Sequence, residues 1–137
     1  MDNCIFCKII KGDIPSYKLY EDEYTYAFMD IANDIDGHIL VIPKKHVTNV
    51  LDCDEATLSQ VMATVKKISI LLVDKCGYDG VNVLNASGEC AGQTVFHLHF
   101  HIIPKKKNDG ISAWPKLPGG KDGVEATYKK IMNAINE

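Results

Sequence analysis

The amino-acid sequence predicts an α+β protein in which a five-stranded antiparallel sheet carries its helices on one face. Five short segments are rich in aromatic or β-branched residues, which is typical of strands. Residues 55–76 instead repeat their apolar side chains with helical spacing. Between Gly92 and Pro104, histidine alternates with apolar residues, and this alternation indicates a strand with one buried face.

The first half of the chain predicts a short helix followed by three strands. Residues 4–10 are expected to form a helix that ends at Gly12. Residues 17–20 and 24–30 are rich in aromatic side chains and flank three acidic residues, so they predict a β-hairpin. Residues 38–43 are strongly apolar and predict a strand that ends with proline.

The second half predicts the longest helix, two more strands and a terminal helix. Residues 55–76 form the long helix, and Asp52 or Asp54 is expected to cap its first turn. Residues 80–84 predict a strand, and the histidine segment follows as the fifth. Residues 124–135 predict a final amphipathic helix.

Composition and charge set limits on the function. A chain of 137 residues, 46% hydrophobic and 24% charged, is expected to form one globular domain. Its net charge of −3 gives no reason to expect nucleic-acid or membrane binding. The sequence from Met1 lacks the basic and apolar regions of a signal peptide, and no apolar stretch is expected to span a bilayer. Five cysteines then predict reduced thiols, metal ligands or both in a cytoplasmic protein.

The three histidines of the alternating segment, His97, His99 and His101, are expected to line one face of their strand. Imidazole is both a base and a nucleophile near neutral pH, so three on one face suggest a catalytic site. The alternative is a core strand that happens to carry histidines. That alternative is disfavoured because the outer face of such a strand normally carries mixed polar residues.

Residues 93–103, Gln-Thr-Val-Phe-His-Leu-His-Phe-His-Ile-Ile, resemble the histidine triad (HIT) motif, and residues 28–31 and 37–46 resemble flanking segments of that family. The resemblance extends from Cys4 to Pro104. It implies a HIT-like fold, with residues 1–137 as a single HIT domain. It also implies a homodimeric enzyme that acts on nucleotides through a covalent nucleotidyl-histidine. The nucleoside phosphoramidase-like branch is favoured over the dinucleoside polyphosphate hydrolases.

The catalytic residues follow from the resemblance and from phosphoryl-transfer chemistry. His99, flanked by imidazoles on both sides, is the expected nucleophile, and His101 is expected to donate to a phosphoryl oxygen. Backbone amides after Gly92, with the side chains of Gln93 and Thr94, are expected to cradle the phosphate. The resemblance also places Thr94 on the leaving-group side. The catalytic set is completed by His97 and by the family's fourth histidine, His38, either as an orienting partner of the triad or as a structural residue.

The resemblance implies that Asp30 binds the ribose hydroxyls of a purine nucleotide, and a carboxylate is a suitable acceptor for that diol. An apolar slot for the base is expected from Ile5, Phe6, Ile9, Phe28 and Ile31, with Val95 also in contact with the nucleotide. The alternative interpretation is that these apolar residues belong only to the hydrophobic core. The family often has an asparagine seven residues before the glutamine, where this chain has Ala86; Asn85 is shifted by one position, and Ser87 could substitute.

Cys4 and Cys7 form a Cys-x-x-Cys pair, which supplies two ligands of a tetrahedral zinc site. A redox dithiol is disfavoured because the surrounding pattern is not thioredoxin-like. The resemblance implies that His46 and His97 complete a structural zinc site. The other three cysteines are expected to be small buried apolar groups: Cys53, Cys76 and Cys90.

Two other classes of function fit the same residues. The three histidines could hold a catalytic zinc that activates water, which would make the protein a metallohydrolase. The chain could also be a nucleotide-binding regulator with little turnover.

Overall fold

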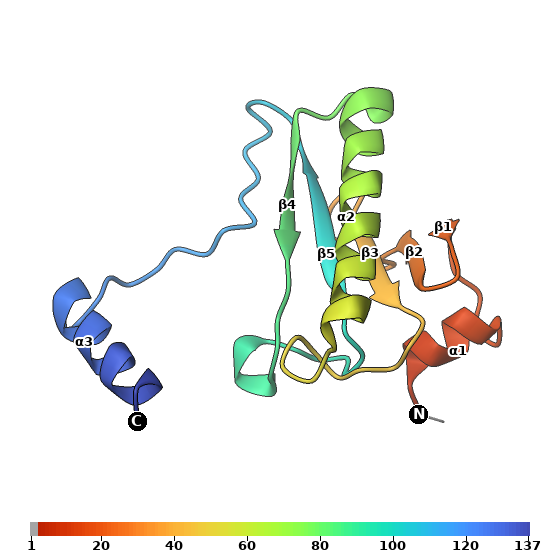
Figure 1. Ribbon diagram of the computed structural model, residues 1–137. Helices are drawn as coiled ribbons and strands as arrows, with labels where there is room; N and C mark the ends of the chain where they lie inside the picture. The colour runs from red at the N-terminus through yellow and green to blue at the C-terminus, as the bar shows by residue number, and fades with distance from the viewer. Residues whose placement is uncertain (1–2) are drawn as a thin grey trace.

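The computed structural model describes residues 3–137. The prediction that the chain has no signal peptide rests partly on residues 1–2, which lie outside the described part. The five strands of the structure form one antiparallel sheet in the order β1-β2-β3-β5-β4 (Figure 1). The strands are β1 (Lys18–Glu21), β2 (Thr25–Met29), β3 (Ile39–Pro43), β4 (Gly80–Leu84) and β5 (Phe100–Lys105). The helices are α1 (Ile5–Lys11), α2 (Glu55–Cys76), the short 3₁₀ helix η1 (Glu89–Ala91) and α3 (Val124–Ile135). The α+β class and the five-stranded antiparallel sheet are therefore confirmed.

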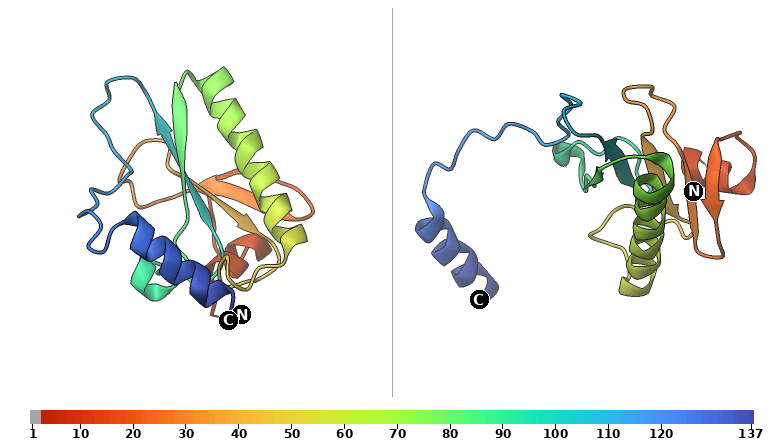
Figure 2. Two further views of the ribbon diagram at one scale, coloured as in Figure 1. Left: turned by 60° about the vertical axis from the view of Figure 1, so that its left-hand side comes forward. Right: turned by 90° about the horizontal axis from the view of Figure 1, so that it is seen from above.

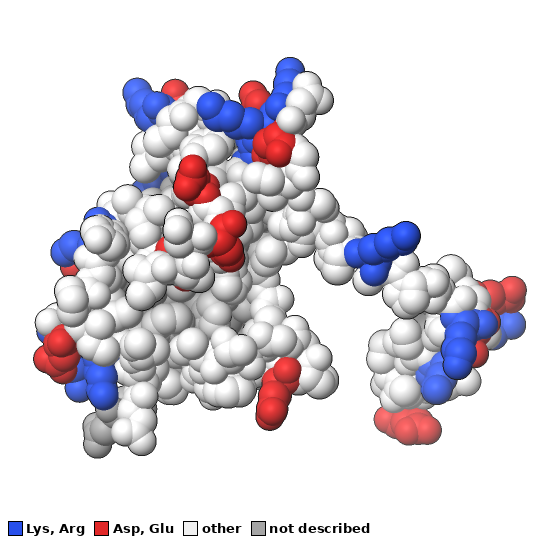
Figure 3. All heavy atoms as spheres, turned by 180° about the vertical axis from the view of Figure 1, so that it is seen from behind, with Lys and Arg blue, Asp and Glu red and all other residues white. Residues whose placement is uncertain are grey.

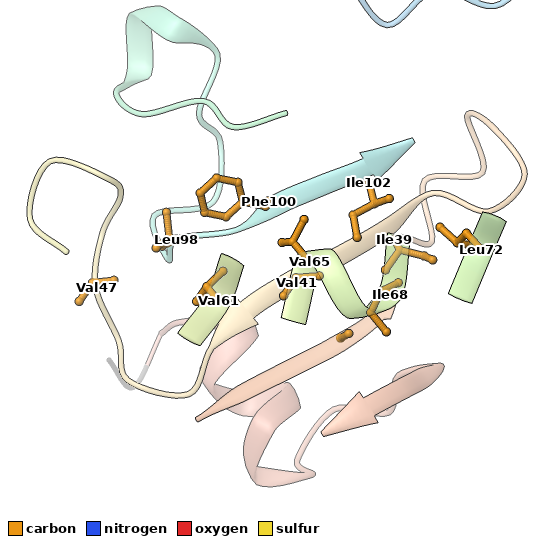
Figure 4. Packing of buried hydrophobic residues seen from close by; sticks show 11 residues of the cluster. Ile39, Val41, Val47, Val61, Val65, Ile68, Leu72, Leu98, Phe100 and Ile102 are labelled. Atoms are coloured by element: carbon orange, nitrogen blue, oxygen red, sulfur yellow. The ribbon is translucent and has the colours of Figure 1, made fainter. Parts of the chain in front are cut away.

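Helix α2 begins and ends where the sequence predicts. The Asp54 carboxylate accepts a hydrogen bond from the Thr57 amide and caps the first turn, and Gly77 ends the helix with a φ of 79°. The apolar side of α2 packs on β3 and β5 and forms the main core (Figure 4). The buried side chains of α2 in this core are Val61, Val65, Ile68 and Leu72.

Helix α1 covers part of the opposite face of the sheet. Its Phe6 and Ile9 pack against Phe28 of β2 and Leu40 of β3, whose side chains point away from α2 because alternate residues of a strand face opposite sides. Figure 2 shows α1 and α2 from two further directions. The expectation that the helices cover one face therefore holds for α2 and is wrong for α1.

The histidine segment is only partly a strand. β5 contains the third histidine, whereas His97 and His99 precede it in irregular backbone, contrary to the prediction of a strand from Gly92. Gly92 has a φ of 99°, and Leu98 donates its amide hydrogen to the Val47 carbonyl, 2.8 Å away, instead of to a neighbouring strand. The alternation still holds, because the apolar residues between the histidines lie together in the main core.

By length and composition alone, α2 is apolar enough to cross a membrane, since an 18-residue window has a mean hydropathy of 1.3. On this criterion alone, the prediction that no apolar stretch is long enough to span a bilayer is not met. However, 33% of that window is buried inside the protein, and its packing on the sheet is that of the core helix of a globular domain.

Candidate active site

The nucleophile expected from the sequence, His99, is buried and held from two sides. Its Nδ1 donates a hydrogen bond to the His97 carbonyl, 2.8 Å away. The backbone carbonyl of His99 accepts a hydrogen bond from Asn85 Nδ2 at 3.0 Å, and Asn85 is in turn held by Ser87 Oγ at 2.7 Å. Asn85 and Ser87, which the sequence offered as candidates for a phosphate contact, thus hold the backbone of His99, a contact that the sequence did not predict.

The Gln93 side chain braces the loop before the triad. Its side chain is buried, and Nε2 donates to the carbonyls of Thr48, at 2.7 Å, and Val95, at 3.0 Å. Its Oε1 accepts from Asn49 Nδ2 and from the Gly88 amide. Both donor hydrogens are used, so the predicted role of the Gln93 side chain in a phosphate cradle is wrong.

Gly92 and Thr94 lie exposed on either side of Gln93. Space around Gly92 is open, since a Cβ added there would meet no atom within 4 Å. Its φ of 99° nevertheless favours glycine. These two residues therefore present accessible backbone and a hydroxyl beside the triad, as a phosphate cradle requires.

His38 connects His101 to two carboxylates. Its Nε2 lies 2.8 Å from His101 Nδ1, and its Nδ1 lies 2.9 Å from Asp34 Oδ1. Asp30 Oδ2 is 3.6 Å from His38 Nε2, and Asp30 Oδ1 accepts the Ala32 amide. His38 therefore contacts the triad directly, as an orienting partner would, and Asp34 is a member of this chain of contacts that sequence analysis missed.

Burial disfavours the charged form of the triad imidazoles. It lowers the pKa of His97 and of His101 to about 4, and it also lowers the pKa of His99. The neighbouring charges of His99 and His38 lower the pKa of His101 further, while Asp30 and Asp34 raise it. A neutral imidazole has one bare nitrogen, so each histidine is available as a base, a ligand or a nucleophile.

The apolar residues expected in the base slot divide into two groups. Phe6, Ile9 and Phe28 are buried core residues, as their alternative interpretation stated, whereas Ile5 and Ile31 are exposed. The Phe6 ring lies edge-on to His99, with 5.2 Å between ring centroids, so the core under α1 also supports His99. Val95 is half-buried and packs against the same cluster.

A second group joins Cys4 and Cys7 of the α1 region to His46 and His97, with all four ligand atoms within 4.8 Å of one another. His97 Nδ1 lies 3.3 Å from Cys4 Sγ and 3.1 Å from His46 Nδ1, and Cys7 Sγ lies 3.4 Å from His46 Nδ1. A tetrahedral zinc with ordinary bond lengths separates its ligand atoms by about 3.3–3.8 Å. The donor set therefore fits zinc, and the predicted convergence of these four residues is confirmed.

The tautomer of His97 also suits a metal. Its Nε2 donates to the Pro43 carbonyl, 2.8 Å away, so the lone pair of the neutral ring is on Nδ1, which faces the cysteines. The remaining cysteines differ from expectation, because Cys76 and Cys90 are exposed and Cys53 is half-buried. Cys53 packs against the edge of the main core, whereas Cys76 is the last residue of α2 and Cys90 lies in η1, and both are exposed.

The three triad imidazoles do not converge on one metal position. His97 Nδ1 faces the cysteine pair, while His99 Nδ1 is committed to a carbonyl. His101 Nδ1 and His38 Nε2 are 2.8 Å apart, which is a hydrogen bond and shorter than the ~3.3 Å between two nitrogens on one zinc. This geometry disfavours the metallohydrolase interpretation.

Known proteins resemble this chain over most of its length. A family model described as the HIT domain matches residues 11–108. The adenosine 5'-monophosphoramidase HNT1 of Candida albicans is 45% identical over 139 residues, covering 97% of this chain and 91% of that protein. The solved structure of a HIT family member from Bacillus subtilis is 45% identical, with a TM-score of 0.84, and the match covers 98% of this chain and 95% of that one. The solved structure of a zinc-bound histidine triad protein from Mycobacterium smegmatis is 34% identical, with a TM-score of 0.76, and the match covers 86% of this chain and 85% of that one.

The range of the family model, residues 11–108, includes the five strands, the loop that carries Gln93 and all three triad histidines. The similarity in sequence and the similarity in fold both extend over nearly the whole chain. The chain belongs to the HIT family.

Proposed function

We propose that this HIT protein hydrolyses the bond at the α-phosphate of purine nucleotide conjugates, phosphoramidates above all, through a covalent nucleotidyl-His99. The supporting observation is the 2.8 Å hydrogen bond from His99 Nδ1 to the His97 carbonyl. A carbonyl only accepts, so Nδ1 carries the hydrogen and Nε2 holds the lone pair. A buried imidazole with a fixed, bare Nε2 is ready to attack phosphorus.

In the proposed first step, His99 Nε2 attacks the α-phosphorus and the bond from phosphorus to the leaving amine breaks. The electron pair goes to the amine nitrogen, which takes a proton from a neighbouring acid. His101, whose ring centroid lies 5.0 Å from that of His99, is that acid and also holds a non-bridging oxygen. In the second step water attacks phosphorus, the bond to His99 breaks, and the water proton passes to His101.

The nucleoside is proposed to lie over the α1 face of the sheet. Asp30 would accept hydrogen bonds from the two ribose hydroxyls, since its Oδ2 has no partner closer than 3.6 Å among the contacts described for it. Ile5 and Ile31 offer exposed apolar surface for a purine base. The HNT1 relative, whose name states adenosine 5'-monophosphoramidase activity, supports the same substrate class.

We expect the catalytic efficiency, kcat/KM, to be at least about tenfold higher for adenosine 5'-phosphoramidate than for the cytidine analogue, because one extra ring of apolar contact stabilises the complex by roughly 1–3 kcal/mol. Diadenosine tetraphosphate should be hydrolysed more slowly than either. Release of nucleoside monophosphate, followed by chromatography, measures all three. Faster hydrolysis of the dinucleotide would favour a dinucleoside polyphosphate hydrolase, and tight AMP binding with no turnover would favour a regulator.

The cysteine–histidine group is proposed to bind one structural zinc. Bound zinc would supply a rigid anchor for His97, whose carbonyl holds His99 Nδ1. We place the enzyme in the cytoplasm, where the thiols of Cys4 and Cys7 stay reduced. Residues 1–137 are proposed to act as one HIT domain, with α3 as an extension of it.

A homodimer is proposed through the outer side of α2 and the edge strand β4. This side of α2 has a shallow hollow lined in part by Ala63, Ile70 and Leu71, and Val83 of β4 is also exposed. Every residue of α3 is exposed, and the helix stands apart from the body in Figure 3, with its charged side chains mixed in sign. The exposed apolar surface on α2 and β4 favours a second copy of the chain as partner, since two-fold dimers are the commonest oligomers.

Light scattering of the native chain at micromolar concentration is expected to give the mass of two chains. Ile70→Glu with Leu71→Glu should shift it to one chain, because two charges would then be buried in the interface. Leu19→Glu on the other edge strand is the matched control and should leave the dimer intact. A native chain that is monomeric throughout this range would contradict the proposed assembly.

A further inference from the structure

Asp34 lies in the loop before β3, at the outer end of a chain of contacts that leads to the reacting centre. Asp34 Oδ1 lies 2.9 Å from His38 Nδ1, and His38 Nε2 lies 2.8 Å from His101 Nδ1. The His38 side chain is 7% exposed, so both ring nitrogens depend on these partners. The remaining nitrogen of His101, Nε2, is the one left for the substrate.

The carboxylate determines which nitrogen of His38 carries hydrogen. A carboxylate only accepts, so His38 Nδ1 must be N–H, and in the neutral ring Nε2 is then the acceptor. His101 Nδ1 must consequently donate to it, which leaves His101 Nε2 bare. Without Asp34, nothing fixes this direction, and the opposite tautomers of both rings satisfy the same 2.8 Å contact.

We propose that Asp34 is a positioning residue that acts through His38 on His101, fixing the direction of this hydrogen-bond chain and stabilising the positive charge when the histidine pair holds an extra proton. This inference rests on the proposed function for its role in turnover. A buried aspartate does the same for the histidine of serine proteases, where its replacement by asparagine costs roughly 10⁴-fold in kcat.

The two hydrolytic steps need both states of the pair. In the first step His101 Nε2–H gives its proton to the leaving amine, and the pair becomes neutral with His101 Nε2 bare. In the second step that bare Nε2 takes the proton of the attacking water, and the pair is charged again. The anionic phosphate favours proton uptake by the pair on binding, since an opposite charge favours the protonated form.

The other titratable groups around the pair are Asp30 and His99. Asp30 Oδ2 is 3.6 Å from His38 Nε2, which is beyond hydrogen-bond distance, so it does not select a tautomer. The His99 ring lies 5.0 Å from His101 between centroids and has its own Nδ1 bound to a carbonyl. Asp34 is therefore the acceptor that orients His38.

The inference is tested with Asp34→Ala in the full chain, with Asp36→Ala as the matched control, because Asp36 is an exposed carboxylate of the same loop. Nitrogen-15 NMR of labelled histidines at neutral pH should show His38 as the Nδ1–H tautomer in the native chain and the control. In Asp34→Ala the Nε2–H tautomer should appear. An unchanged His38 tautomer in Asp34→Ala would overturn the proposal, and this measurement needs no turnover.

Single-turnover kinetics supply the second readout. The Asp34 side chain is 57% exposed, so we expect about a tenfold loss of rate on adenosine 5'-phosphoramidate, far less than for a buried aspartate. Release of nitrophenolate from the 4-nitrophenyl ester of AMP should change less than about twofold, because that leaving group needs no proton. Asp34→Asn keeps an acceptor oxygen without the charge, so it should retain the tautomer and lose part of the rate. Equal losses on both substrates would contradict the proposal, whereas no turnover by the native chain would contradict the proposed function alone.

Discussion

His99→Gly is expected to lower the single-turnover rate on adenosine 5'-phosphoramidate by on the order of 10⁴-fold or more, because it removes the atom that forms the covalent bond. The fold should survive, since His99 contributes one side-chain hydrogen bond and contacts with Phe6. AMP should still bind, because Asp30 and the apolar surface remain. Quenched-flow kinetics and a binding titration with AMP measure the two quantities separately.

The other triad variants provide the internal comparison. His101→Ala should lower the single-turnover rate less, by roughly 10²–10³-fold, because it removes a proton donor and leaves His99 in place. His97→Ala should act mainly through folding, since His97 is fully buried and bonded to the Pro43 carbonyl. A larger loss of rate for His101→Ala than for His99→Gly would mean that the nucleophile is misassigned.

The second large effect is expected from Cys4→Ala combined with Cys7→Ala. When free zinc is present at 100 to 1,000 times its Kd, loss of the site lowers the free energy of unfolding by about 3–4 kcal/mol. In a domain of this size that lowers Tm by roughly 10 °C. The rate should fall as well, because His97 would lose its anchor and His99 is held by the His97 carbonyl. Elemental analysis of protein purified without added metal, together with thermal unfolding, measures both.

The matched control for the metal is Cys76→Ala combined with Cys90→Ala, which also removes two thiols, both exposed and away from the cysteine–histidine group. We expect one zinc per chain in this control and in the native protein. An unchanged zinc content in the Cys4, Cys7 double variant would contradict the assignment of the ligands.

Most of the fold could be predicted because local signals and the tertiary structure agree. In α2 the apolar spacing, the Asp54 cap and the Gly77 stop all indicate the same helix. The histidine segment was predicted only in part, because the bonds of Gln93 to the Thr48 and Val95 carbonyls replace strand pairing. Side-chain bonds of that kind leave no periodic signal in a sequence.

The site was predictable in its residue types and less so in its contacts. The motif identified the triad, the Cys-x-x-Cys spacing identified Cys4 and Cys7, and the resemblance added the two histidines that the structure brings to them. Asp34 was missed, and the bond of Asn85 to the His99 carbonyl was not predicted, because nothing in residue spacing marks either contact. Whether Phe6 and Ile9 belong to the core or to the base slot also depends on burial, which the sequence pattern leaves open.

Trapping the intermediate tests the central proposal most directly. The native chain is mixed with adenosine 5'-phosphoramidate, quenched within the first turnover under mildly alkaline conditions, and analysed by intact-mass and peptide mass spectrometry. We expect one adenylyl group per chain, located on His99 and absent from His99→Gly. Turnover without any adduct on the native chain, or the same adduct on His99→Gly, would contradict covalent catalysis by His99.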